Sequence, residues 1–188
     1  NKKINQILLT SNTLSSSKII SNFKFKKTIH QFFPIDTNYH TQKFLNYWKP
    51  SLATFIDSEI WPNMITNIKK NDTTLILLNG RITDKSFSRW KMFSSSAKTL
   101  FQKFDICFSS SYKSKNYLKS LGAKKIRYIG NLKFAQTEKK EVSLNKNLIN
   151  FFSSKKIWSA ASTHKTEEKI CAIVHKKLKI KYKNFLTI

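Results

Sequence analysis

Polar and charged side chains stand directly after several short apolar runs of this sequence. Such runs are typical of buried strands, and in open α/β sheets ligands bind beyond the carboxyl ends of the strands. The residues at these places are therefore the first candidates for chemistry. They are Ser58, Glu59, Asn79, Arg81, Lys133, Ser162, Thr163 and His164.

Glu59 and Lys133 are the two candidates for a catalytic role. A carboxylate at the end of a strand can act as a base or stabilise a developing cationic sugar. It can also be a helix N-terminal carboxylate, with Pro62 fixing the first turn of the helix. The ammonium of Lys133 can neutralise a leaving phosphate without proton transfer, although a lysine in so basic a chain is ordinarily solvated. For each residue the spacing leaves both interpretations open.

Other candidates are suited to binding an anion. Arg81 follows a tight turn that Gly80 permits, and its guanidinium could pair with a phosphate or a carboxylate. Ser162 and Thr163 offer hydroxyls and helix N-terminal amides that suit a phosphate, with His164 close by. The alternative for this last segment is a capping box, in which a Ser or Thr is followed by Glu.

The residue spacing predicts no metal site. The chain contains no Asp-x-Asp pair that would suggest a metal-held nucleotide sugar, and Cys107 and Cys171 share no metal-ligand or redox spacing. We expect two reduced, partly buried thiols. With only three glycines, the chain also has no glycine-rich phosphate loop.

The elements that must position these residues alternate between strands and helices. Their apolar residues are continuous rather than alternating, as in a parallel sheet that is covered on both faces. We therefore predict a Rossmann-like α/β domain for residues 1–134. The predicted strands are residues 6–10, 28–33, 52–56, 73–78, 106–108 and 125–129, and the predicted helices are residues 41–48, 60–70, 86–104 and 111–121.

The pattern changes towards the end of the chain. Residues 135–147 are polar and charged, and we interpret them as a linker or crossing between domains. The alternation then restarts, with a strand at residues 156–161, a helix at about 166–179 and a strand that begins near Asn184. Residues 148–188 are therefore expected to be the start of a second, truncated α/β domain.

The composition excludes several classes of protein. A hydrophobic content of 40% and an aromatic content of 13% predict a folded chain with a sizeable core. Lysines are spread along the whole length and only three of the 35 basic residues are arginines, whereas nucleic-acid readers rely on the guanidinium fork. The net charge of +25 therefore favours a solvated basic surface, and after that an anionic membrane or phosphorylated lipid, over a nucleic-acid partner.

Neither a membrane span nor a signal peptide is predicted within the chain. Nowhere do eighteen consecutive apolar residues occur, and the first residues lack a charged and then apolar signal pattern. The chain opens on Asn1 instead of Met and closes on an apolar run at residues 185–188, so we expect it to be a fragment of a longer protein.

The order and the residues of these segments resemble those of one family, the 3-deoxy-D-manno-octulosonic acid (Kdo) transferases. The resemblance is carried by Ser-Glu-Ile-Trp-Pro-Asn at residues 58–63, Asn-Gly-Arg at 79–81, Gly-Asn-Leu-Lys-Phe at 130–134, and Ala-Ser-Thr-His at 161–164 followed by two glutamates. The segments at residues 8–11 and 33–36 are also similar to family segments, so the likeness covers nearly the whole chain.

The resemblance implies a GT-B fold, in which an N-terminal domain receives the lipid acceptor and a C-terminal domain holds the donor, CMP-Kdo. It implies metal-independent transfer of Kdo to a lipid A precursor (lipid IVA) with inversion, in lipopolysaccharide inner-core biosynthesis, without a cofactor. The implied partners are CMP-Kdo, the lipid A precursor and the anionic surface of the inner membrane. The implied location is the cytoplasmic face of the bacterial inner membrane, with any anchor outside this chain.

By the same resemblance, Glu59 and Lys133 match the family's glutamate and lysine that stabilise the transition state. The family's general base lies upstream of the first strand seen here and its Pro-Arg-His segment would follow Ile188, so we expect the chain alone to be inactive. Asn12 and Leu14 depart from the family pattern in the first βα loop. The implied substrate-binding residues are Ser58, Asn79, Arg81, Ser162, Thr163 and His164.

Two alternatives to this function stay open. The first is another GT-B glycosyltransferase that uses a different nucleotide sugar, such as a UDP-sugar. The second is a non-catalytic basic α/β module that binds an anionic membrane or nucleic acid.

Overall fold

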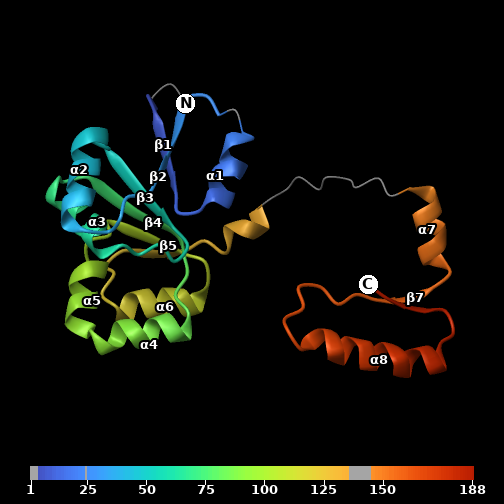
Figure 1. The fold of residues 1–188 in the computed structure, drawn as a ribbon. Helices are drawn as coiled ribbons and strands as arrows, with labels where there is room; N and C mark the ends of the chain where they lie inside the picture. The colour runs from blue at the N-terminus through green and yellow to red at the C-terminus, as the bar shows by residue number, and fades with distance from the viewer. Residues whose placement is uncertain (1–3, 24, 136–144) are drawn as a thin grey trace. The chain divides into compact units, whose positions relative to one another are not determined.

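The chain folds into two compact units, Asn1–Thr137 and Glu138–Ile188. The structure is a computed structural model and describes residues 4–23, 25–135 and 145–188. Figure 1 shows both units. Most of the predicted crossing at residues 135–147 lies outside the described residues. Its last two residues, 146 and 147, are the first residues of a helix.

The first unit is built on parallel strands. Four of them, β3 (Leu52–Ile56), β4 (Thr74–Gly80), β5 (Ile106–Ser109) and β6 (Ile126–Tyr128), form one sheet in the order β3-β4-β5-β6. All neighbouring pairs are parallel. A second parallel pair joins β1 (Ile7–Ser11) to β2 (Thr28–Phe32). The predicted parallel α/β fold is therefore confirmed.

Helices follow these strands in the predicted alternation (Figure 1). Their bounds are α1 (Leu14–Ser21), α2 (Asn38–Trp48), α3 (Pro62–Lys70), α4 (Asp84–Met92), α5 (Ser94–Phe101), α6 (Tyr112–Ser120) and the short 3₁₀ helix η1 (Leu132–Ala135). Thr83 is one of four Ser or Thr residues whose side chain caps the helix that follows it. Such a cap is what a strand-to-helix loop requires, because the first helical N–H groups have no partner within the helix.

One predicted helix is wrong. Residues 86–104 were expected to form a single helix, but the chain leaves the helical conformation at Phe93, where φ is −116° and ψ is 50°. Three serines follow at residues 94–96, and serine competes with helix-interior hydrogen bonds through its own side chain. The segment therefore splits into α4 and α5.

The core lies around strand β4. Leu75 and Leu77 on one face of this strand are completely buried. Ile76 and Leu78 point to the opposite face, since side chains alternate along a strand, and they are half-buried. Apolar residues on both faces explain the continuous run in the sequence. Fully buried side chains from α3, α5 and α6 complete the core; they include Ile65, Phe101 and Leu118.

The second unit contains a parallel βαβ segment. Strands β7 (Lys156–Trp158) and β8 (Phe185–Thr187) pair in parallel and are joined by α8 (Glu167–Lys181). A further helix, α7 (Lys146–Ser153), precedes β7 and was not predicted from the sequence. Among residues 145–188 no side chain is fully buried.

Candidate functional site

The carboxyl edge of the four-stranded sheet gathers most of the candidate residues. Asp57 to Glu59 follow β3, Asn79 lies within the last two residues of β4, and Lys133 follows β6. Because the strands are parallel, their carboxyl ends share one edge. The sequence-based prediction that Glu59 and Lys133 follow strands of one parallel sheet therefore agrees with the structure.

The carboxylate of Glu59 is held by two neutral donors. Its Oε2 atom accepts a hydrogen bond of 2.7 Å from the indole Nε1 of Trp61 and one of 3.1 Å from Nδ2 of Asn12. Glu59 is exposed, and no described group bonds to its Oε1. No described cation forms an ion pair with it either. Among the described residues, the carboxylate is thus oriented by neutral donors alone, and its Oε1 has no hydrogen-bond partner.

Asp36 holds the segment that follows Glu59 by capping helix α3. Trp61, the N-cap residue of α3, makes no side-chain capping bond. The carboxylate of Asp36 does so instead, because it accepts the N–H groups of Asn63 at 3.1 Å and Met64 at 2.8 Å. The Trp61 ring also packs against Phe33, with ring centroids 5.2 Å apart.

Asn79 is buried beneath this edge. Only 4% of the residue is exposed. Its Nδ2 donates to Oδ1 of Asp57, and its Oδ1 accepts the N–H of Leu132 at 3.1 Å. Asn79 and Asp57 both have left-handed backbones, with φ of 55° and 58°. Such strained non-glycine conformations cluster at functional sites.

Ser58 and Arg81 are joined to each other next to Glu59. The hydroxyl of Ser58 donates to the carbonyl of Arg81 at 2.8 Å, and the Arg81 N–H donates to the carbonyl of Asp57 at 3.1 Å. These bonds use the main chain of Arg81. Its side chain is exposed, and no described carboxylate pairs with the guanidinium. The guanidinium of Arg81 is therefore available to bind an anion, whereas the Ser58 hydroxyl holds the Arg81 main chain in place.

Lys133 lies in η1, whose start is bonded to the end of β4. Neighbouring strands are about 4.8 Å apart, so the ends of β3 and β6 are separated by roughly 14 Å within the sheet. The loop after β6 shortens this separation, because Leu132 bonds to Asn79 at the end of β4, the neighbour of β3. The N–H of Lys133 donates to Oδ1 of Asn131 at 3.1 Å, and the residue is exposed.

Ser162, Thr163 and His164 lie in the second unit, between the end of β7 and the start of α8. The alternative of a capping box is not realised, because the N-cap residue Thr166 makes no side-chain capping bond. Instead Glu167 reaches back and accepts the N–H of His164 at 2.8 Å. Ser162 has a left-handed backbone with φ of 57°. No described group bonds to the hydroxyl of Ser162 or Thr163, so both are available to a ligand.

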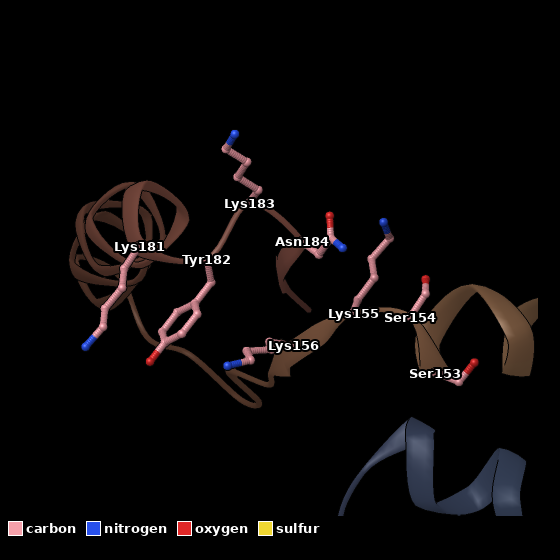
Figure 2. Close-up of a pocket in the computed structure, with 8 residues that line it drawn as sticks. All are labelled: Ser153, Ser154, Lys155, Lys156, Lys181, Tyr182, Lys183 and Asn184. Atoms are coloured by element: carbon pink, nitrogen blue, oxygen red, sulfur yellow. The ribbon is translucent and has the colours of Figure 1, made fainter.

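A basic pocket lies at the other end of the second unit. Its volume is about 440 Å³, and it adjoins the amino ends of β7 and β8 and the C-terminus of α8 (Figure 2). It is lined by Ser153, Ser154, Lys155, Lys156, Lys181, Tyr182, Lys183 and Asn184. In Figure 2 the ammonium groups of Lys155 and Lys183 point away from those of Lys156 and Lys181, so the four do not converge on one ligand. Lysines at a helix C-terminus also complement its dipole.

Among the residues that the structure describes, no group of three His, Cys, Asp or Glu side chains lies where it could hold a metal ion. None of the described helices combines the length and the apolar character that crossing a membrane requires.

Comparison with known proteins identifies one family. A family model described as 3-deoxy-D-manno-octulosonic-acid transferase (kdotransferase) matches residues 1–136, the part that carries Glu59 and Lys133. The chain is 36% identical over 176 residues to a 3-deoxy-D-manno-octulosonic acid transferase from Rickettsia bellii. This match covers 93% of the chain and 42% of the relative, so the chain spans less than half of the length of that protein.

Two solved structures share the fold. One is a Staphylococcus aureus MnaA–UDP complex, with a TM-score of 0.54 and 14% identity over 98% of this chain and 61% of the other. The second is a putative UDP-N-acetylglucosamine 2-epimerase from Listeria monocytogenes, with a TM-score of 0.56 and 11% identity over 97% of this chain and 53% of the other. At these identities the likeness shows the fold alone, and it confirms the expected GT-B type.

Proposed function

The chain belongs to the 3-deoxy-D-manno-octulosonic acid (Kdo) transferase family, and from this premise we propose that it is part of a glycosyltransferase that moves Kdo from CMP-Kdo to a lipid A precursor. The observation that carries the proposal is the edge of the parallel sheet, where a carboxylate oriented by neutral donors and an exposed lysine follow β3 and β6. Sugar transfer from a nucleotide develops positive charge on the sugar and negative charge on the leaving phosphate, and one group of each charge can stabilise the two.

Glu59 acts on the sugar. As the bond between the anomeric carbon and the phosphate breaks, positive charge develops on that carbon and its ring oxygen. A carboxylate already oriented by Trp61 and Asn12 stabilises this charge without reorganisation during the reaction. Because both of its partners are neutral donors, the carboxylate keeps its full negative charge for the substrate.

Lys133 acts on the leaving group. The electron pair of the breaking bond moves to a phosphate oxygen of CMP, which an ammonium stabilises without giving up a proton. In this proposal the positive charge comes from Lys133, and the reaction is independent of a metal and of a cofactor. The acceptor hydroxyl attacks from the face opposite to CMP, so the configuration at the anomeric carbon inverts. The base that takes the hydroxyl proton is not assigned to a residue of this chain.

Arg81 and the segment from Ser162 to His164 bind the anionic parts of the substrates. The Arg81 guanidinium suits a carboxylate or a phosphate, since it can form two parallel hydrogen bonds with either. The hydroxyls of Ser162 and Thr163 stand near the N-terminus of α8, where a phosphate is favoured. Ser58 supports the site indirectly, through its bond to the Arg81 carbonyl.

The net charge of +25 supports a place at an anionic membrane, where the lipid acceptor resides. We propose the cytoplasmic face of the inner membrane, within lipopolysaccharide synthesis. One competitor is a glycosyltransferase of the same fold that uses a different nucleotide sugar, such as a UDP-sugar.

The test is a transfer assay with defined substrates. The protein, at the length in which its organism makes it, is incubated with lipid IVA and either CMP-Kdo or UDP-N-acetylglucosamine, and the lipid product is analysed by mass spectrometry and NMR. We expect a Kdo-containing product from CMP-Kdo alone, with inverted configuration. Transfer from the UDP-sugar instead would establish the competitor. No transfer from either donor, with salt-sensitive binding to anionic vesicles, would establish a non-catalytic module.

A further inference from the structure

Asn79 connects the two loops that carry the proposed catalytic groups. Its side chain lies at the end of β4, between the loop after β3 and the loop after β6. Nδ2 donates to Oδ1 of Asp57 in the first loop, and Oδ1 accepts the N–H of Leu132 in the second loop at 3.1 Å. One buried amide thus joins segments that are 22 and 53 residues away in the sequence.

Each of these bonds ends close to a proposed catalytic residue. Asp57 stands two residues before Glu59 and is also held by main-chain bonds, from its N–H to the Leu78 carbonyl and from the Arg81 N–H to its own carbonyl. Leu132 directly precedes Lys133. A shift of the Asn79 amide therefore moves both loops.

Asn131 strengthens the second connection. Its Oδ1 accepts the N–H of Lys133 at 3.1 Å and also lies 3.5 Å from Nδ2 of Asn79. Two successive N–H groups, those of Leu132 and Lys133, are thus bonded to side-chain oxygens of Asn79 and Asn131. The start of η1 is fixed in place relative to the end of β4.

Asn79 has an unusual backbone conformation for a non-glycine residue. Its φ of 55° is in the left-handed region, which is strained for a non-glycine residue. Glycine would remove this strain, but it has no side chain to bridge the loops. Asparagine tolerates the left-handed region better than other residues do and supplies both a donor and an acceptor. With 4% of the residue exposed and both ends of the amide bonded, little of it remains for a ligand.

We infer that Asn79 is a positioning residue, which sets the separation of Glu59 and Lys133 by joining the Asp57 loop to the Leu132 loop, instead of contacting the substrate. The inference rests on the proposed function of those two residues. Its consequence is kinetic, since a misplacement of about 1 Å at a reacting centre can cost about a hundredfold in rate.

The first test removes the amide. Asn79→Ala should lower kcat by about a hundredfold and change KM by less than about threefold. Hydrogen exchange at the Leu132 amide should become faster in the same variant, because its acceptor is gone. This readout is measured on the chain without any substrate, so it does not depend on the proposed reaction.

The second test exchanges the partners. Asn79→Asp places a carboxylate against that of Asp57 and should lower kcat as Asn79→Ala does. Adding Asp57→Asn to Asn79→Asp restores one donor and one acceptor in reversed order and leaves an acceptor for the Leu132 N–H. The double variant should therefore regain slow Leu132 exchange and a kcat within about tenfold of the wild type. It also serves as the test if Asn79→Ala does not fold.

Several outcomes would overturn the inference. An Asn79→Ala variant with raised KM and unchanged kcat would make Asn79 a substrate contact. Unchanged kcat despite fast Leu132 exchange, or a double variant no better than Asn79→Asp, would show that the bridge has no kinetic role. Failure of the proposed function would give a different result. Glu59→Gln and Lys133→Ala would then keep normal turnover, whether hydrogen exchange at the Leu132 amide is fast or slow.

Discussion

Removing the side chain of Asp36 is expected to destabilise the first unit by about 2 kcal/mol. The carboxylate accepts the N–H groups of Asn63 and Met64 at the start of α3, whose own N-cap residue, Trp61, makes no side-chain bond. Loss of a helix cap costs about 1 kcal/mol. Met64 is only 2% exposed, so its N–H is left without a partner away from water, which costs about 1–3 kcal/mol. These contributions overlap, so about 2 kcal/mol is the expected sum.

The measurement is urea unfolding of Asp36→Ala followed by circular dichroism, with thermal unfolding as a second readout. For a unit of this size, 2 kcal/mol corresponds to a decrease in Tm of roughly 6–10 °C. Asp36→Asn is the matched control, since its one carbonyl oxygen can satisfy one of the two N–H groups, and it should lose about half as much. A loss below about 0.5 kcal/mol in Asp36→Ala, or equal losses in both variants, would refute the capping argument.

Two further predictions concern titration and reactivity. Partial burial alone would raise the pKa of Asp105, but the N–H of Leu75 and the ammonium of Lys69 outweigh it and hold the pKa below 3.8. Asp105→Asn should therefore be less stable than the wild type above about pH 4. Urea unfolding should show that this difference in stability becomes smaller as the pH falls further. A difference in stability that is independent of pH would contradict the ion pair. Burial raises the pKa of the Cys107 thiol to about 12, so a thiol reagent at about pH 8 should find one fast thiol, the half-buried Cys171. Fast labelling that persists in Cys171→Ser would contradict this.

The strands of the first unit were predictable from the sequence because their apolar residues form short continuous runs. The run at residues 52–56 coincides with β3, and the run at 73–78 lies within one or two residues of β4. Continuous apolar residues identify such strands without knowledge of their neighbours. The break at Phe93 was not predictable in this way, since apolar spacing continues through it while the backbone does not.

The candidate site was predictable as an edge but not as a set of contacts. Once the strands are parallel, Glu59 and Lys133 must follow ends on the same side of the sheet. The bonds that position them join residues far apart in the sequence: Asn12 to Glu59 spans 47 residues, and Leu132 to Asn79 spans 53. Such pairs depend on the exact path of each loop, which residue types and spacing do not determine. The helix α7 was missed because its first two residues were assigned to the polar crossing and its other six were left without an element before the predicted strand at residues 156–161.

The central claim is that Glu59 and Lys133 act on the reaction and not on folding. Both residues are exposed, so neither Glu59→Gln nor Lys133→Ala opens a cavity or leaves a buried charge, and stability should change by less than about 1 kcal/mol. Asp72→Asn and Lys124→Ala are matched controls, because these exposed residues precede β4 and β6 at the opposite edge of the same sheet.

The most direct test is the turnover of Kdo transfer from CMP-Kdo to lipid IVA, measured for these four variants and the wild type together with their Tm. We predict a decrease of about a hundredfold for Glu59→Gln and for Lys133→Ala, the scale of losing one preorganised electrostatic group, with Tm unchanged and with both controls near the wild type. Turnover near that of the wild type in either site variant, or a decrease fully explained by unfolding, would contradict the account.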